Sequence, residues 1–291
     1  SVWIAAEDPK DAGALVQTLS ESVERVCPQL TVKAEVVARQ EYAQRIQEAA
    51  VNESLPDVFC TDGLEDSFLE AGCCADLSKL LHTMELSDYL YFGELGADED
   101  VYALPTALQA GIVYGSKAKA EQEQEAAEMD TLAQSNDTLG YADSDDAFTR
   151  FQEPDDPLAW IVGDLSDMDQ VEAVTVEAVP STDFSAVPLV KEEKLVGSLA
   201  HWYAVKQSGD ENRQDAGMAL LSLLLSEGMQ SALYMDNRDG LPLNRTVLDS
   251  YKENKLTTYL EFLRHYDLEE VQLYDSDGKS LCSRIRQEIS K

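Results

Sequence analysis

Few residues in this 291-residue chain have the type and spacing that catalysis requires. The three histidines, His82, His201 and His265, lie far apart in the sequence, so they predict no metal site. The chain has no Gly-x-Ser-x-Gly elbow, no glycine-rich loop for phosphate and no His-Glu-x-x-His zinc motif. Carboxylate pairs suited to glycoside hydrolysis must arise by chance among 56 acidic residues, so they carry no information. The sequence therefore indicates that the protein is not an enzyme.

The cysteines show no spacing typical of a metal site or a disulfide framework. Because there are five, at least one thiol is expected to be free. The adjacent pair Cys73-Cys74 has a poor geometry for a mutual bridge and lies in an apolar segment, which favours buried thiols. A disulfide between distant cysteines stays open. Asp275-Ser276-Asp277-Gly278 suggests calcium ligands, but Arg286 stands where a calcium loop needs glutamate, so we interpret the segment as a turn. No metal or cofactor is expected.

The charge of the chain excludes one class of partner. With 22 basic and 56 acidic residues, the formal net charge is −34, which repels phosphates and anionic lipid headgroups. Nucleic acid is therefore not an expected partner, and the acidity is typical of solubility in a salty or extracellular medium. No run of 18 apolar residues is present, so no transmembrane helix is predicted. The sequence starts without Met, and we expect that a leader preceded it.

One stretch, residues 28–81, organises the chain as strand, helix, strand and helix. Its first strand alternates apolar residues from Leu30 to Val36, and the apolar period then changes to helical spacing over residues 42–49. Pro56-Asp57 ends this helix and starts the strand Val58-Phe59-Cys60. The polar segment 61–66 follows that strand and opens another helix. Since ligands bind beyond the carboxyl ends of strands in an open α/β sheet, this segment is a candidate binding site.

The rest of the chain also reads as α/β. Asp8 is placed to cap a helix that Pro28 stops, and Asp210 caps a helix that continues to Gly228. The other predicted elements are an extended stretch over 101–114, a solvated helix over 118–132, a loop over 135–146, a strand over 171–179, and C-terminal helices that include Tyr259, Leu260, Leu263, Ile285 and Ile289. Two further strands, over 160–164 and 196–205, are implied by the resemblance that the motifs below carry.

Short motifs in this order resemble the extracellular solute-binding proteins of bacterial ABC transporters, especially the sugar-binding branch. The motifs are Cys27-Pro28-Gln29-Leu30-Thr31-Val32, Pro56-Asp57-Val58, Gly72-Cys73-Cys74-Ala75-Asp76-Leu77 and Tyr102-Ala103-Leu104-Pro105. The most specific is the helix ending in Met229-Gln230, followed by Leu241-Pro242-Leu243-Asn244. The chain departs from the family pattern at Gly115, where the pattern has Asn, and over residues 118–150.

The resemblance implies two α/β lobes joined by hinge crossings, with a ligand cleft between them, as in periplasmic binding proteins. The first lobe would contain residues 1–106 and 183–237. The second, abbreviated lobe would contain residues 107–182 and 238–291.

The resemblance also implies a function: capture of a small uncharged solute, expected to be a carbohydrate, and its delivery by cleft closure to the membrane permease of an ABC transporter. The protein would be a monomer outside the cytoplasm, either a cell-surface lipoprotein or periplasmic. Aromatic rings can stack on the C–H faces of a sugar, and carboxylates and amides can bind its hydroxyls. The expected ligand-binding residues are Asp62, Glu65, Gln109, Trp160, Asp164, His201, Trp202 and Asp239.

Two alternatives remain at this stage. The departures at Gly115 and over 118–150 would also suit a surface or sensory lipoprotein that resembles a solute-binding protein but has lost transport. In addition, each tryptophan could be a core residue instead of a cleft residue, because tryptophan is largely buried on average.

Overall fold

The chain forms two compact units. The structure, a computed structural model, describes residues 1–6, 13–26, 28–95, 100–116, 126–134, 138–144, 146–153, 155–168, 171, 184–234, 240–253, 266–268, 270–273 and 281–290. Unit 1 comprises Ser1–Ala107, Ala200–Asp236 and Pro242–Val247. Unit 2 comprises Leu108–Leu199, Asn237–Leu241 and Leu248–Lys291.

These bounds differ from the predicted lobes in two segments and at the single residues Ala107 and Asn237. Residues 184–199, which the sequence assigned to the first lobe, belong to unit 2, because their strands pair there. Residues 242–247, assigned to the second lobe, belong to unit 1.

Unit 1 is built on a four-stranded sheet with the order β11-β3-β1-β2. Strand β1 (Val2–Ala6) pairs in parallel with β2 (Ala34–Ala38) and with β3 (Val58–Cys60), while β11 (Tyr203–Val205) runs antiparallel to β3. All three residues of β3 are buried, as the apolar run Val58-Phe59-Cys60 predicted. Because β3 lies between two strands, its exit is held firmly, and the polar residues that follow it start from a fixed point.

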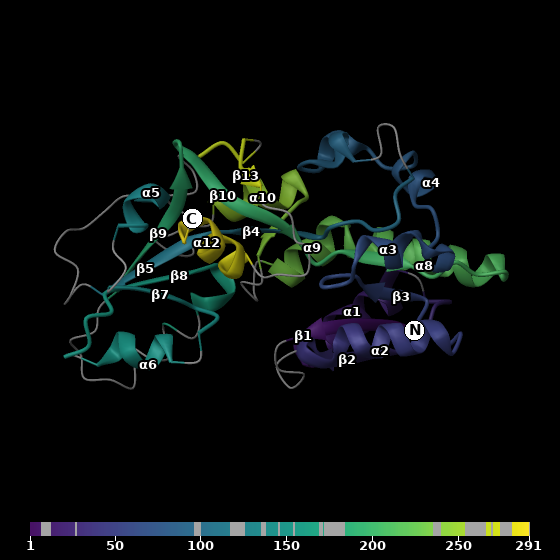
Figure 1. Cartoon of the computed structure of the whole chain (residues 1–291). Helices are drawn as coiled ribbons and strands as arrows, with labels where there is room; N and C mark the ends of the chain where they lie inside the picture. Colours follow the sequence, from purple (N-terminus) through teal and green to yellow (C-terminus); the bar gives the residue numbers. More distant parts are fainter. Residues whose placement is uncertain are drawn as a thin grey trace. The chain divides into compact units, whose positions relative to one another are not determined.

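Helices surround this sheet. Helix α1 (Gly13–Val26), α2 (Arg39–Val51) and α8 (Glu211–Leu224) lie alongside the four strands in Figure 1. Helix α9 (Glu227–Tyr234) follows α8, and the unit also contains the short turns α3 (Asp66–Phe68), η1 (Leu69–Cys73), α4 (Ser78–Leu81), η2 (Leu86–Asp88) and η3 (Phe92–Glu94). Helix α10 (Arg245–Glu253) begins in unit 1 and belongs to unit 2 from Leu248 onward. Helix α2 buries Tyr42, Ile46 and Ala49, which confirms the predicted apolar face. Asp210 caps α8 as predicted, through a bond from the backbone N–H of Asn212.

Unit 2 contains a larger mixed sheet with the order β12-β4-β10-β9-β5-β8-β7, to which β6 and β13 add by pairing with β9 and β10. The strands are β4 (Ala107–Ala110), β5 (Ile112–Ser116), β6 (Ala127–Glu128), β7 (Leu139–Tyr141), β8 (Trp160–Gly163), β9 (Phe184–Lys191), β10 (Lys194–Ala200), β12 (Leu241–Pro242) and β13 (Gln272–Leu273). The helices are α5 (Met129–Leu132), α6 (Ala147–Gln152) and α12 (Leu281–Ile289), with the turn η4 (Leu165–Asp167) after β8. The core between β5, β8, β9 and α12 includes Val113, Val162, Val187 and Ile285.

Several sequence predictions in unit 2 are wrong in detail. The predicted solvated helix over 118–132 contains strand β6 and only one helical turn, α5, in its described part. The predicted loop over 135–146 contains β7, which pairs in parallel with β8. In both cases pairing with a distant strand decides the structure, and local composition does not reveal it. The continuous strand predicted over 196–205 is interrupted at His201. The strand predicted over 171–179, apart from Val171, and the helical residues Tyr259, Leu260 and Leu263 lie outside the described residues.

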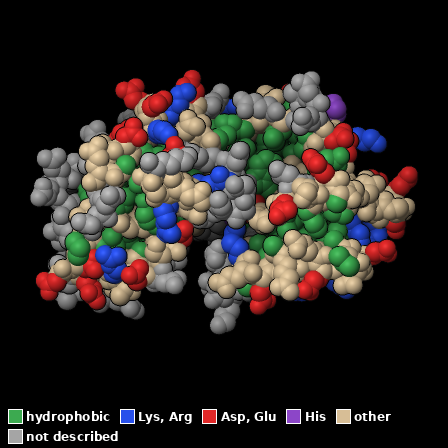
Figure 2. All heavy atoms as spheres, viewed as in Figure 1, with side chains coloured by type: hydrophobic (Ala, Val, Ile, Leu, Met, Phe, Trp, Pro, Cys, Tyr) green, Lys and Arg blue, Asp and Glu red, His purple; other side chains and the backbone are tan. Residues whose placement is uncertain are grey.

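The surface view agrees with the acidic composition. On the face shown in Figure 2, Asp and Glu side chains lie in several separate places, with Lys and Arg side chains among them. Within the described segments no single helix is long and apolar enough to cross a membrane; α8 and α9 would pass by combined length and composition, but a 60° bend separates them.

Candidate functional site

The exit of β3 carries an aspartate whose carboxylate binds the backbone of another segment. Asp62 Oδ2 accepts a hydrogen bond of 3.1 Å from the His201 N–H, and Oδ1 accepts one of 2.9 Å from the Trp202 N–H. The Thr61 N–H donates in turn to the Trp202 carbonyl at 2.7 Å. The Asp62 side chain is only 12% exposed. Three predicted site residues are thus in contact with one another in unit 1.

His201 has a backbone conformation that explains this contact. Its φ of 54° lies in the left-handed region, which a residue with a Cβ seldom adopts. In this conformation the chain turns between β10 and β11, and the consecutive N–H groups of His201 and Trp202 both reach the Asp62 carboxylate. The imidazole stacks with the Tyr234 ring at a centroid distance of 6.3 Å, and its Nδ1 lies 3.8 Å from Asp62 Oδ2. Backbone strain of this kind is concentrated at functional sites.

Thr106 joins the same cluster from the segment before β4. Its N–H donates to the carbonyls of Ala200 and His201, both at 3.2 Å, and its hydroxyl donates to the His201 carbonyl at 3.0 Å. The Tyr234 hydroxyl lies 2.7 Å from the Thr106 hydroxyl. Since the single hydroxyl hydrogen of Thr106 is already used, Tyr234 is the donor in this pair.

Gln230 ties a third segment to this network. The side chain is fully buried, and its amide donates to the Thr106 carbonyl at 2.9 Å and to the Leu224 carbonyl at 3.2 Å. Its carbonyl oxygen accepts from the N–H groups of Leu243 at 2.8 Å and Asn244 at 3.4 Å. Within unit 1, the Gln230 amide therefore links Thr106, just before the chain enters unit 2 at Leu108, with Leu243 and Asn244, just after the chain leaves unit 2 at Leu241.

The sequence analysis named neither Thr106, Tyr234 nor Gln230 as a site residue. A signal for two of them was present: Gln230 ends the Met229-Gln230 motif, and Thr106 follows the Leu104-Pro105 motif. No sequence pattern marked Tyr234.

Burial keeps nearby side chains neutral around the Asp62 carboxylate. Burial raises the pKa of the Cys60 thiol, and the charge of Asp62 adds to the shift. Burial likewise raises the pKa of the Tyr203 phenol, with a smaller contribution from Asp62. Both groups are therefore protonated at neutral pH, and neither offers a nucleophile or base at this point of the molecule.

Glu65 and Gln109 belong to different units, and Asp239 is not placed. Glu65 is exposed in unit 1, and its carboxylate accepts a bond of 3.3 Å from the Ser67 hydroxyl. Gln109 is half-buried in β4 of unit 2. Asp239 lies outside the described residues.

Trp160, in unit 2, packs against the core of that unit. It begins β8, is partly buried, and contacts the cluster that includes Val113 and Val162. Its ring lies over Gly115 of β5, where a Cβ would approach Trp160 Cζ3 to 2.3 Å. This close approach gives a physical reason for glycine at position 115, where the family pattern has Asn.

The Asp164 carboxylate caps the turn that follows β8. Its Oδ1 accepts bonds from the Ser166 N–H at 2.9 Å and the Ser166 hydroxyl at 2.5 Å, while the Asp164 N–H donates to Asp167. The residue is 8% exposed. These contacts form a reciprocal cap of η4, so they give Asp164 a structural task within unit 2.

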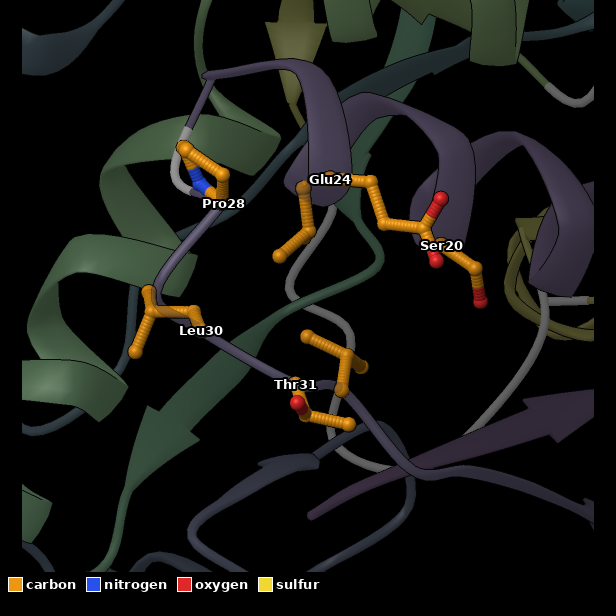
Figure 3. Close-up of a pocket in the computed structure, with 7 residues that line it drawn as sticks. Ser20, Glu24, Pro28, Leu30 and Thr31 are labelled. Atoms are coloured by element: carbon orange, nitrogen blue, oxygen red, sulfur yellow. The ribbon is translucent and has the colours of Figure 1, made fainter.

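A pocket of about 280 Å³ lies elsewhere in unit 1. Figure 3 shows Ser20 and Glu24 extending from α1 on one side and Pro28, Leu30 and Thr31 from the segment before β2 on the other. None of the predicted site residues is among the lining residues. Over the described ranges, no group of three or more His, Cys, Asp or Glu side chains is arranged to hold a metal ion.

Solved structures of solute-binding proteins resemble the whole chain. The GacH receptor of Streptomyces glaucescens is 17% identical with a TM-score of 0.66, and the match covers 100% of this chain and 92% of that one. UgpB from Mycobacterium tuberculosis is 14% identical with a TM-score of 0.68, covering 99% and 96%. An ABC transporter solute-binding protein from Thermotoga lettingae is 12% identical with a TM-score of 0.68, covering 99% and 91%. No family model matches the sequence, and no curated protein sequence does.

At these identities the similarity is one of fold, and it extends over both units. The sequence motifs, the two α/β units and the full-length match agree. The chain has the two-lobed fold of the sugar- and solute-binding proteins of ABC transporters.

Proposed function

We propose that this protein captures a small uncharged solute, a saccharide, and delivers it to the membrane permease of an ABC transporter. The full-length structural similarity carries this proposal, because it covers more than nine-tenths of each similar protein as well as this chain. The GacH protein is named as a receptor and the Thermotoga lettingae protein as a solute-binding protein. This supports a binding role in preference to a catalytic one.

Two of the three ligands named for the similar proteins, acarbose and α-D-tagatose, support a saccharide as the solute, whereas glycerophosphocholine is a zwitterion of another class. The GacH receptor is described in complex with acarbose, UgpB with glycerophosphocholine, and the Thermotoga lettingae protein with α-D-tagatose. The net charge of −34 favours an uncharged solute over an anion, since a strongly negative protein repels anions at long range. Delivery to a permease, a monomeric state and a location outside the cytoplasm, in the periplasm or as a cell-surface lipoprotein, are parts of the same proposal.

Within unit 1, the Asp62 cluster offers the best place for solute contact. Trp202 is half-buried and follows the strained His201, and Thr106 and Tyr234 bring hydroxyl groups to the same network. Trp202 would stack on the sugar, while the Asp62 carboxylate would hold the Trp202 backbone in position. In unit 2, Trp160 and Gln109 remain the proposed contacts, while Asp164 of unit 2 and Glu65 of unit 1 take a lesser part.

Native mass spectrometry tests this proposal. Protein purified without a denaturing step is expected to retain a neutral saccharide, or to bind one from a panel of mono- to tetrasaccharides, with the mass lost on denaturation. Trp202→Ala should weaken binding by about 1 to 3 kcal/mol, the range typical of an aromatic anchor. Tyr102→Ala is the matched control, because it also removes an aromatic side chain from unit 1, one whose hydroxyl donates to the Asp100 carboxylate. The proposal would be contradicted if the protein binds no saccharide of the panel, or if the wild type and Trp202→Ala bind the saccharide with equal affinity.

A further inference from the structure

Two neighbouring thiols in unit 1 face one another. Cys73 ends the π-helical turn η1 and Cys74 follows it, and their Sγ atoms are 3.8 Å apart. Adjacent side chains in an extended strand point to opposite faces. Here the turn is interrupted at Gly72, whose φ is 80°, and the chain is extended only from Cys74, whose φ is −100° and ψ is 142°, so the two residues are not neighbours in a regular strand and their sulfurs lie close together.

The two thiols differ in access to solvent. Cys73 is half-buried, and its thiol donates to the Phe68 carbonyl at 3.3 Å. Cys74 is only 3% exposed. Burial raises the pKa of the Cys74 thiol, and the neighbouring Cys73 adds to the shift. An external reagent therefore reaches Cys73 first, and Cys74 can act only after it.

The backbone on both sides of the pair is held in place. The Cys73 carbonyl accepts a bond of 2.7 Å from the Gln207 N–H, and the Ala75 N–H donates to the Val205 carbonyl at 2.8 Å. Cys74 itself forms an antiparallel bridge with Lys206. The thiols thus keep their mutual position instead of moving apart with a free loop.

We propose that Cys73 and Cys74 form a reversible redox site that closes into a vicinal disulfide by exchange with a small-molecule disulfide. The Cys73 thiolate attacks one sulfur of the reagent and releases one thiolate, which leaves a mixed disulfide on Cys73. Cys74 then loses its proton, attacks the Cys73 sulfur and releases the second thiolate. The protein loses two electrons and two protons, and the reagent is reduced to two thiols.

The geometry makes this bond easy to reduce again. Successive Cα atoms are about 3.8 Å apart across a trans peptide, whereas bridged cysteines normally have Cα atoms about 4.4 to 6.8 Å apart. Closure therefore strains the backbone, and strained disulfides are the labile ones. Because the closed loop contains no intervening residue, the bond also constrains the unfolded chain very little. The oxidised protein should be less stable than the reduced one.

Peptide mapping by mass spectrometry tests this site in the full chain. Folded protein is incubated with oxidised glutathione over a range of concentrations, quenched with acid and digested. The peptide that contains both Cys73 and Cys74 should lose the mass of two hydrogen atoms and regain it with dithiothreitol. The buried thiols of Cys60 and Cys282 serve as internal controls and should stay reduced. The oxidised protein should melt at a lower temperature than the reduced protein.

Single variants separate the two steps. Cys74→Ser should stop at glutathione attached to Cys73, and Cys73→Ser should not react at position 74. Three results would overturn the proposal: bridging of either residue to Cys27, faster modification of Cys74 than of Cys73, or a folded wild type whose pair stays reduced at every glutathione concentration. A higher melting temperature after closure would also contradict it.

Discussion

Two aspartates that the sequence singled out as ligand contacts bind other parts of the protein. Asp62 accepts the N–H groups of His201 and Trp202, and Asp164 accepts those of the turn after β8. A sequence pattern can place a carboxylate at the exit of a strand, but it cannot tell whether the nearest donor belongs to a solute or to a distant backbone segment. The ligand role of both residues stays a prediction, whereas the structure shows the hydrogen bonds of their structural role.

Asp62 is therefore expected to matter for stability as well as for binding. Asp62→Ala leaves the N–H groups of His201 and Trp202 without their acceptor and should lower the free energy of unfolding by about 1 to 3 kcal/mol. Asp62→Asn keeps one acceptor oxygen and should lose less. Urea unfolding measures both, with Asp215→Asn, an exposed position on α8, as the control. If Asp62→Ala unfolds at the same urea concentration as the control, the carboxylate does not hold these segments together.

The contact between Gly115 and Trp160 gives a second residue-scale prediction. A methyl group on Gly115 would lie 2.3 Å and 2.8 Å from two Trp160 ring carbons, so Gly115→Ala should destabilise by about 1 to 3 kcal/mol. In a Trp160→Leu background the same change should cost less, because the ring that it meets is gone. Thermal or urea unfolding of the double-mutant cycle measures the difference. Gly228→Ala is the control, since no atom lies within 4 Å of its Cβ position. Equal costs in both backgrounds would rule out the ring contact as the cause.

At the scale of elements, the hairpin between β9 and β10 carries an unusual turn. Glu192 and Glu193 have φ values of 51° and 65°, which is the pattern of a type I′ turn, normally occupied by Asn and Gly. A left-handed conformation costs roughly 1 to 2 kcal/mol for a residue with a Cβ. Lys191 still pairs with Lys194 across this turn, so the hairpin forms despite the unfavourable backbone conformation.

Glu193→Gly should therefore stabilise the protein. The relief of left-handed strain exceeds the added entropy of the unfolded chain, and we expect a gain of about 0.5 to 1 kcal/mol in thermal unfolding. Lys194→Gly, one residue later in the regular strand β10, is the matched control and should lose a similar amount. Should both glycines destabilise equally, the turn is not strained.

Gln230 gives an element-scale prediction with a pH dependence. In Gln230→Glu the protonated carboxyl can still donate to the Thr106 carbonyl and accept from the Leu243 N–H, but the ionised form cannot donate. Burial raises the pKa of such a carboxyl above its unfolded value of about 4.3. The variant should thus be near wild-type stability below pH of about 4 and lose stability as pH rises toward the higher folded pKa.

Urea unfolding of wild type and Gln230→Glu across this pH range measures the effect as a difference, which cancels the titration of the other carboxylates. Gln214→Glu on α8 is the control, because Gln214 uses its carbonyl oxygen to accept from the Ser208 N–H and is only half-buried. A Gln230→Glu variant whose loss of stability is the same at every pH would show that its side chain does not donate at this position.

The local sequence pattern predicted helices and strands correctly where the spacing of apolar residues matches the residues that the structure buries. The apolar run 58–60 gave β3, the helical spacing over 42–49 gave α2, and Asp210 capped α8. Strand β7 was missed because its three residues, Leu139 to Tyr141, are half-buried and are held by pairing with β8, in which the partner of Leu139 is Trp160, 21 residues further along the chain. The break at His201 was missed because φ of 54° in a histidine has no local signature.

At the scale of the whole molecule, short motifs indicated the fold more reliably than they indicated the site. The order of the motifs depends on how strands and helices alternate through the chain, and the full-length structural matches confirm the fold that this order predicted. The boundary between the lobes was harder to predict, because β9 pairs with β5 and β10 pairs with β9. Residues 184–199 therefore belong to unit 2, although they lead directly into unit 1 at Ala200. Whether a residue belongs to the site depends on which groups its side chain contacts, and the carboxylates of Asp62 and Asp164 contact the protein's own backbone.

Thermal unfolding with a panel of saccharides tests the central claim most directly. A solute that binds only the folded protein must raise its stability by mass action, by about 2.7 kcal/mol at a hundred times the dissociation constant. We predict that at least one mono- to tetrasaccharide raises the melting temperature progressively with concentration, and that Trp202→Ala needs more of it for the same shift. If no saccharide shifts the melting temperature at any concentration, the protein does not capture a saccharide and the account is wrong.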